Sequence, residues 1–170
     1  MGPPSDRSEL DRLVREHLPT AVRFAVRLTG DLDRAEEVVA EALARAARSW
    51  KTFRGEAQFR SWLFRIVINA FRDQHAARPA TEELPGELLD RRCVNPASAA
   101  MASDLGQLVA RLISRLPPRQ REVLVLTAFE GMEPSEAAAI LGISAESARS
   151  NLHQARKWLR ARLARYLSES

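Results

Sequence analysis

The segment from Pro134 to Leu163 contains two helix-forming stretches that are separated by a very short turn. The first stretch ends at Gly142, a residue that readily takes the positive φ with which many helices end. Ser144 follows as a natural N-cap for a second, longer helix. Ala138 lies four residues before the glycine, where a small side chain lets two helices cross closely. This pattern predicts a helix-turn-helix.

The second helix of this motif separates apolar from polar side chains. Its predicted buried stripe repeats at three- and four-residue steps and consists of Ala148, Leu152, Ala155, Leu159 and Leu163. No acidic residue occurs between Ser147 and Ser168. We expect the outward side chains to contact base edges and phosphates, and the candidates are Ser147, Arg149, Ser150, Asn151, His153, Arg156 and Lys157. The alternative is an amphipathic helix whose arginines form a solvated face.

The charge of the chain favours a polyanionic partner. The chain has 170 residues and a formal net charge of +4, and Lys51 and Lys157 are its only lysines. Guanidinium groups fork onto phosphate and guanine, so nucleic acid is the expected partner. The basic residues lie in two blocks on either side of an acidic connector, which favours two small domains over one.

Catalytic, metal and membrane signals are weak. Cys93 is the only cysteine, so an intramolecular disulfide or a cysteine-rich metal site is not expected. The three histidines are far apart in sequence, and neither a phosphate-cradling glycine loop nor a nucleophile elbow appears. No apolar run approaches the length of a membrane span. We expect a soluble, cytoplasmic protein without cofactor, metal or enzymatic activity.

Residues 1–78 show helical periodicity throughout. A helix capped at Ser5 or Ser8 is expected first, then a second helix that opens at Pro19 and stops at Gly30. Asp31 or Asp33 would cap a third helix. The fourth begins near Phe59, and its predicted inner side chains are Phe59, Trp62, Leu63, Ile66, Val67, Ala70 and Phe71.

Residues 79–103 break this periodicity with three prolines and a glycine, which predicts a flexible linker. Asn95 and Pro96 suit the start of a helix that continues to Ile113. A helix over 119–129 follows, and Gly131 ends it. We therefore predict an all-α protein with domains at 1–78 and 104–170.

Two blocks of residues resemble a known family. Residues 35–41 (AEEVVAE), followed by 53–66 (FRGEAQFRSWLFRI) and Asn69, resemble region 2 of the extracytoplasmic-function sigma factors of bacterial RNA polymerase. Residues 116–124 (LPPRQREVL), the Gly131 break and residues 137–160 resemble region 4 of the same sigma-70-type proteins. The order and spacing of the blocks also match, so the resemblance covers nearly the whole chain.

The resemblance implies specific partners. Glu37 and Glu41 would face the clamp helices of the largest subunit of core RNA polymerase, and region 4 would meet the flap. Glutamine is usual where this chain has Ala40. For Glu36 and Glu37, stabilisation of the helix dipole is the simpler alternative. The resemblance also implies promoter DNA as a partner, leaves room for an anti-sigma factor, and predicts a monomer when the chain is free.

The resemblance places −10 promoter recognition in the loop from residue 54 to 59 and the helix after it. A flipped base needs donors and an aromatic or apolar wall, while the arginines would hold phosphates. The implied contacts are Arg54, Gln58, Phe59, Arg60, Arg65, Asn69 and Arg72. Trp62 and Phe71 lie on the apolar stripe and are expected in the core.

The function implied by the resemblance is that of an alternative sigma factor, which binds core polymerase and directs promoter recognition, strand opening and initiation. A stand-alone helix-turn-helix regulator is the second hypothesis, and a helical adaptor that binds another protein is the third. The acidic linker would thread near the active-site cleft of the polymerase, or would simply be solvated.

Overall fold

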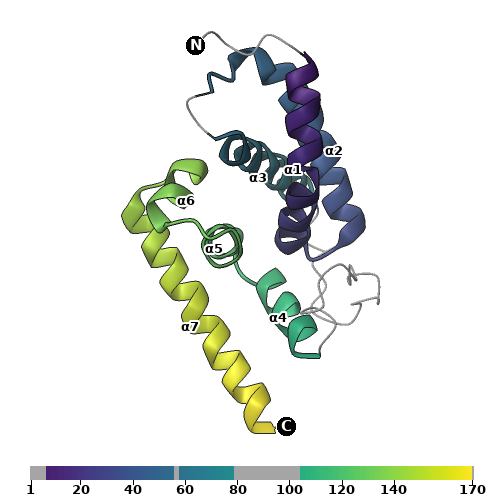
Figure 1. Cartoon of the computed structure of the whole chain (residues 1–170). Helices are drawn as coiled ribbons and strands as arrows, with labels where there is room; N and C mark the ends of the chain where they lie inside the picture. The colour runs from purple at the N-terminus through teal and green to yellow at the C-terminus, as the bar shows by residue number, and fades with distance from the viewer. Residues whose placement is uncertain (1–6, 56–57, 79–103, 170) are drawn as a thin grey trace. The chain divides into compact units, whose positions relative to one another are not determined.

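The computed structural model of the chain describes residues 7–55, 58–78 and 104–169, and every regular element within them is helical (Figure 1). The prediction of an all-α protein is confirmed. The chain divides into two compact units, Met1–Asp90 and Arg91–Ser170, and each is described by itself. The predicted linker over 79–103, with its Asn95 cap, lies outside the described residues.

The N-terminal unit is built from three long helices that all pack against one another. These are α1 (Arg7–Thr29), α2 (Leu32–Ser49) and α3 (Phe59–Ala77), with a short 3₁₀ turn, η1 (Trp50–Thr52), after α2. In the centre of the unit the rings of Phe24 and Phe64 stack with their centroids 4.2 Å apart. α1 and α2 lie side by side, and α3 crosses behind them (Figure 1).

The turn between α1 and α2 forms as the sequence predicts. Gly30 takes a φ of 73°, which ends α1. Of the two aspartates expected as caps, Asp31 is the one that caps α2, because its Oδ1 accepts a hydrogen bond of 2.8 Å from the backbone N–H of Arg34.

α1 runs without a break through Pro19, so the prediction of two helices on either side of this residue is wrong. An interior proline removes one backbone donor and costs about 3 kcal/mol. The apolar face nevertheless continues across it, since Leu10, Ala21 and Phe24 are all buried. Burial of this continuous face against α2 and α3 outweighs the local penalty, as tertiary packing commonly does.

An aromatic cluster, formed by Trp50, Phe53, Phe59 and Trp62, joins the end of α2 to the start of α3. Trp50 stacks on Phe53 with centroids 5.3 Å apart, and Phe59 meets Trp62 at 5.5 Å. His17 of α1 lies 5.3 Å from Phe59. Phe59 is only 7% exposed, so the first residue of α3 is anchored in this cluster.

α3 is buried over a wider arc than the predicted stripe. Phe64 and Ile68, which the predicted inner face omits, are each 1% exposed, whereas Ile66 and Trp62 are half-buried. The reason is that α3 packs against both α1 and α2, so side chains on two adjoining sectors of the helix enter the core. Phe71 is buried as expected.

The C-terminal unit contains α4 (Asp104–Ser114), α5 (Pro118–Leu124), α6 (Pro134–Leu141) and α7 (Ala145–Glu169). α7 packs against each of the other three helices. The predicted helix over 119–129 is α5 extended by one π-helical turn, η5 (Val125–Phe129), in which the Glu130 N–H donates to the Val125 carbonyl at 3.2 Å. Gly131, with a φ of 70°, ends it.

Arg121 holds the tight turn between α4 and α5. Pro117 and Pro118 carry no N–H, so the carbonyl of Ser114, the last residue of α4, is left without its usual backbone donors. Nη2 of the buried Arg121 donates instead to the carbonyl of Ser114 and, at 3.0 Å, to that of Leu116. At Ser114 a side chain thereby replaces the backbone donors that two prolines cannot supply.

The predicted helix-turn-helix is confirmed as α6 and α7. Gly142 takes a φ of 65° and its N–H donates to the Ala138 carbonyl, which ends α6. The hydroxyl of Ser144 accepts from the Ser147 N–H at 3.0 Å and caps α7. Of the predicted stripe Ala148, Leu152 and Ala155 are buried, but Leu159 and Leu163 are only half-buried. This part of α7 extends past α5 and α6 and lies beside α4 alone (Figure 1).

Candidate nucleic-acid interface

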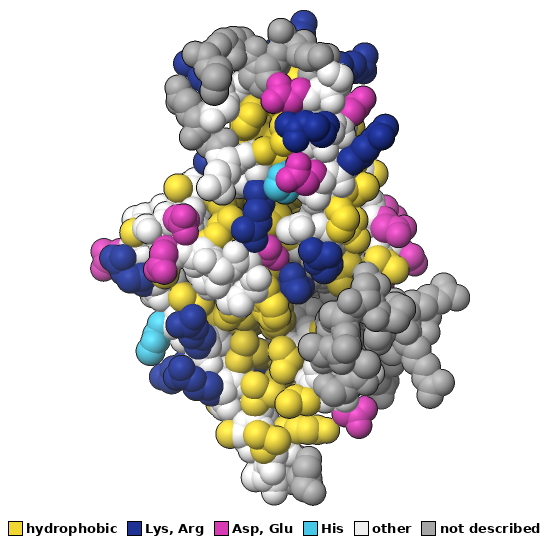
Figure 2. Space-filling model, in the orientation of Figure 1, with side chains coloured by type: hydrophobic (Ala, Val, Ile, Leu, Met, Phe, Trp, Pro, Cys, Tyr) yellow, Lys and Arg dark blue, Asp and Glu magenta, His cyan; other side chains and the backbone are white. Residues whose placement is uncertain are grey.

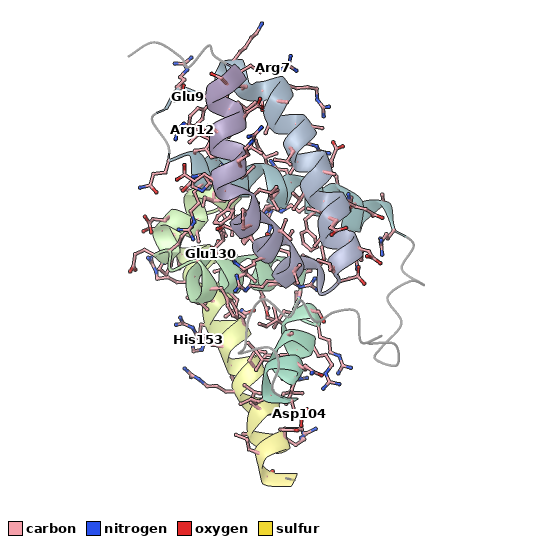
Figure 3. All side chains as sticks on the ribbon, turned by 45° about the vertical axis from the view of Figure 1, so that its right-hand side comes forward. Arg7, Glu9, Arg12, Asp104, Glu130 and His153 are labelled. Atoms are coloured by element: carbon pink, nitrogen blue, oxygen red, sulfur yellow. The ribbon has the colours of Figure 1, made fainter. Side chains whose placement is uncertain are left out.

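The outward side of α7 carries the predicted −35 contacts. Six of the seven, all except Asn151, are exposed, and Asn151 is half-buried. Figure 2 shows dark blue Lys and Arg side chains gathered on α7 beside a cyan histidine, and Figure 3 shows His153 projecting outward from this helix. The face therefore offers hydroxyls, amides and cations to an approaching partner.

The polar residues of α7 fall into two flanks, because successive residues turn by about 100° around a helix. Arg149, His153 and Arg156 recur at four- and three-residue steps and form a basic flank. Ser147, Asn151 and Gln154 recur at the same steps on the opposite flank and form an uncharged flank. Ser150 and Lys157 lie between the two flanks, on the side of α7 opposite its buried stripe.

The uncharged flank is ordered by hydrogen bonds. The Asn151 amide donates from Nδ2 to the Ser147 carbonyl at 2.8 Å, and the Ser144 hydroxyl donates to the Ser147 hydroxyl at 2.8 Å. On the next turn, Gln154 accepts from Gln120 of α5 at 2.9 Å. Gln120 was not among the sequence-predicted residues, and no local pattern pairs it with a position 34 residues away.

Farther along α7 one arginine contacts an aromatic side chain of the same helix. The guanidinium of Arg162 lies over the ring of Trp158, 3.7 Å from its centroid, in a cation–π contact. The predicted basic contacts Arg149, Arg156 and Lys157 all lie in the first half of the helix and are exposed.

The predicted −10 residues do not form one surface. Gln58, Arg65, Asn69 and Arg72 recur along one side of α3, and the first three of these are exposed. Arg60 lies on the opposite, core-facing side, with its guanidinium 5.1 Å from the centroid of the Phe64 ring.

The loop before α3 adds one further exposed candidate, Arg54, next to Gly55 with its φ of 70°. Phe59 differs from expectation, because its ring is enclosed in the aromatic cluster rather than offered to a partner. Sequence periodicity already placed Phe59 on the inner stripe of its helix, so the two expectations for this residue conflicted.

The predicted polymerase contacts lie beside an ion-pair network that joins α2 to α3. Arg45 donates from Nε to Glu41 Oε1 at 2.7 Å and from Nη1 to Asp73 Oδ2 at 2.7 Å. The hydrogen bond from Arg45 lowers the pKa of the Glu41 carboxyl. The hydrogen bonds to Glu41 and Asp73 in turn raise the pKa of Arg45. Arg48 adds a weaker contact to Glu41 at 3.6 Å.

A shallow hollow opens at this network. It is lined from α2 by Glu37, Ala40, Glu41 and Arg45, and from α3 by Asp73 and Gln74. The i, i+4 spacing of Glu41 and Arg45 could have predicted their pairing. Nothing in the local sequence indicates that Asp73 and Gln74 join them.

Within residues 7–55, 58–78 and 104–169, no group of His, Cys, Asp and Glu side chains is arranged to hold a metal ion. Among the same helices, none combines the length and apolar character that crossing a bilayer requires.

Comparison with known proteins assigns both helical units to the same protein family. The family model for sigma-70 region 2 matches residues 13–79, and the model for sigma-70 region 4 matches residues 106–159. The RNA polymerase sigma-E factor of Streptomyces coelicolor is 33% identical over 159 residues, which cover 91% of this chain and 86% of that protein. The chain belongs to the extracytoplasmic-function sigma factors of the sigma-70 family. As a member of this family it is an alternative sigma factor and directs transcription initiation.

Two further relatives agree with this assignment. The ECF RNA polymerase sigma factor SigE of Mycolicibacterium smegmatis is 35% identical over 165 residues, and the match spans 94% of this chain but only 63% of SigE. The sigma factor RpoE of Bartonella quintana, solved in complex with the anti-sigma factor NepR, superposes with a TM-score of 0.77 at 25% identity. That match covers 92% of this sigma factor and 97% of RpoE.

Proposed function

We propose that this sigma factor binds core RNA polymerase through α2 and reads promoter DNA through α3 and α7, without catalysing a reaction itself. Glu37 and Glu41 would contact the polymerase. The exposed side of α3 with Gln58, Arg65 and Asn69 would hold the −10 element, and the outward side of α7 would read the −35 element. Binding of polymerase and promoter DNA by this sigma factor would take place in the cytoplasm.

The observation that carries this proposal is the composition of the outward face of α7. A capped helix of 25 residues follows a tight turn, and from Ser147 to Ser168 it exposes hydroxyls, amides and cations but no carboxylate. Such a face suits a major groove lined with phosphates, because every charged group on it attracts DNA.

Both units should be needed for promoter specificity. Each is small and buries little interface on DNA by itself, so neither is expected to bind one site tightly at physiological salt. Polymerase would hold the two units over their promoter elements, which raises the effective concentration of the second contact.

An anti-sigma factor is the regulatory partner that we propose. RpoE, which shares the fold over almost its whole length, was solved with such a protein bound. A protein that covers α7 or the hollow beside Glu41 would block promoter or polymerase contacts.

The decisive experiment compares the chain with and without core polymerase. We expect it to copurify with the core subunits and to direct transcription from a promoter with −10 and −35 elements. In gel-shift titrations at about 150 mM salt, where weak phosphate contacts are screened, the chain alone should bind duplex DNA poorly. Tight, sequence-specific binding to a palindromic duplex by the isolated chain would contradict the proposal and favour the stand-alone regulator.

A further inference from the structure

The hydrogen bond between Gln120 and Gln154 links the helix-turn-helix to the helix before it. Gln120 is half-buried on α5, and Gln154 is exposed on the uncharged flank of α7. Nε2 of Gln120 donates to Oε1 of Gln154 at 2.9 Å, a normal hydrogen-bond length. α5 and α7 pack closely, so the backbones that carry the two side chains are held next to each other.

This bond determines which end of the Gln154 amide faces outward. A glutamine amide carries an acceptor oxygen and a donor NH₂ group on opposite sides, and its terminal torsion is soft. Because the oxygen of Gln154 is turned toward α5, its NH₂ group is turned away from α5. Gln154 therefore presents hydrogen-bond donors to a partner that approaches the face of α7.

Asn151, one turn earlier on the same flank, is turned the other way. Its Nδ2 donates to the Ser147 carbonyl of its own helix at 2.8 Å, which leaves Oδ1 as the outward atom. The two amides thus have opposite polarity, with an acceptor at Asn151 and a donor at Gln154. The cations Arg149 and Arg156 lie on the other flank, away from these amides.

We infer that Gln120 is a positioning residue for promoter reading. By accepting from Gln120, Gln154 becomes a donor that recognises a −35 base with an acceptor in the major groove and rejects cytosine. Guanine presents O6 and N7 there and thymine presents O4, whereas the polar group of cytosine is the N4 donor. The inference rests on the proposed placement of α7 in the −35 major groove.

The test uses the full chain assembled with core polymerase and a promoter library in which each −35 base is varied. With the unaltered sigma factor, one position should tolerate cytosine about tenfold less well than guanine or thymine. Gln154→Ala should flatten the preference at that position alone. Gln120→Ala should flatten it at the same position, and the double variant should be no worse than Gln154→Ala.

Gln120→Glu provides the sharpest test. A carboxylate only accepts hydrogen bonds, so Gln154 must turn its NH₂ group toward α5 and its oxygen outward. Preference at that one position should then reverse toward cytosine or adenine, which offer donors. Gln107→Glu, which adds the same charge at an exposed position on α4, is the matched control and should leave the base profile unchanged.

Three outcomes would overturn the inference. One is a Gln120→Ala variant that loses activity equally on all promoters with an unchanged base profile, which would mean a phosphate or structural role. Another is a Gln154→Ala variant that reads every base as before. The third is a Gln120→Glu variant that keeps the original preference. Failure of the unaltered chain to use any −35 element with core polymerase would instead reject the proposed function.

Discussion

Arg45 of α2 bonds to Asp73 of α3 at 2.7 Å with the same guanidinium that holds Glu41. One arginine therefore fixes the position of a predicted polymerase contact and ties together the two helices that flank the hollow. The surface expected to meet polymerase is thus an arrangement of both helices rather than a stripe on α2 alone.

Glu41→Arg should weaken binding to core polymerase. The change reverses a charge at the hollow and places a third cation beside Arg45 and Arg48, so the carboxylate presented to the partner is lost. Glu36→Arg, the same reversal on an exposed position of α2 outside the hollow, is the control. Competition with a labelled sigma factor for core polymerase measures the effect, and equal competition by both variants would refute the role of Glu41.

The contribution of Glu41 to folding should depend on pH in one direction. Its carboxyl has a folded-state pKa below the usual value of 4.5 because Arg45 donates to it. Stabilisation by this carboxyl is therefore present above pH 4.5 and is lost as the pH falls through the lowered pKa. Urea unfolding of the sigma factor and of Glu41→Gln should differ at neutral pH and converge in strong acid. A difference that grows on acidification would contradict this sign.

Arg149→Ala should reduce transcription that depends on the −35 element. The side chain projects near the start of α7, where helix-turn-helix proteins reach the groove. Loss of a base contact would cost about 1–3 kcal/mol at one promoter position, whereas loss of a phosphate contact would weaken all promoters and lower the salt dependence. Arg165→Ala, near the other end of the helix, is the control. Equal activity of the two variants on every promoter would exclude both roles for Arg149.

Gln58 and Phe59 are neighbours in sequence but should respond differently to alanine. Gln58 is exposed, so Gln58→Ala should change −10 preference or strand opening without altering stability. Phe59→Ala removes a ring from the aromatic cluster and should cost about 3–5 kcal/mol of unfolding free energy. Permanganate footprinting and thermal unfolding measure these effects. Normal opening and base preference in Gln58→Ala would remove Gln58 from the −10 site.

Local sequence signals predicted those parts of the molecule that local physics determines. Gly142 and Ser144 act through φ and capping, and these depend only on near neighbours. The prediction that a second helix begins at Pro19 is wrong because the packing of α1 outweighs the local penalty. The side of α3 on which Arg60 lies depends on which sectors α1 and α2 cover, and helix periodicity does not supply that information. The contact of Gln120 with Gln154 needs the tertiary fold.

Arg121 also has a consequence for how sequences of this family can diverge. The Ser114 carbonyl that it holds would lack a donor if Pro117 and Pro118 remained while the guanidinium was lost. Replacing both prolines would return two N–H groups to the turn and give the Ser114 carbonyl backbone donors of its own. The three positions should therefore change together among homologues, with a proline pair and an arginine inherited as one unit.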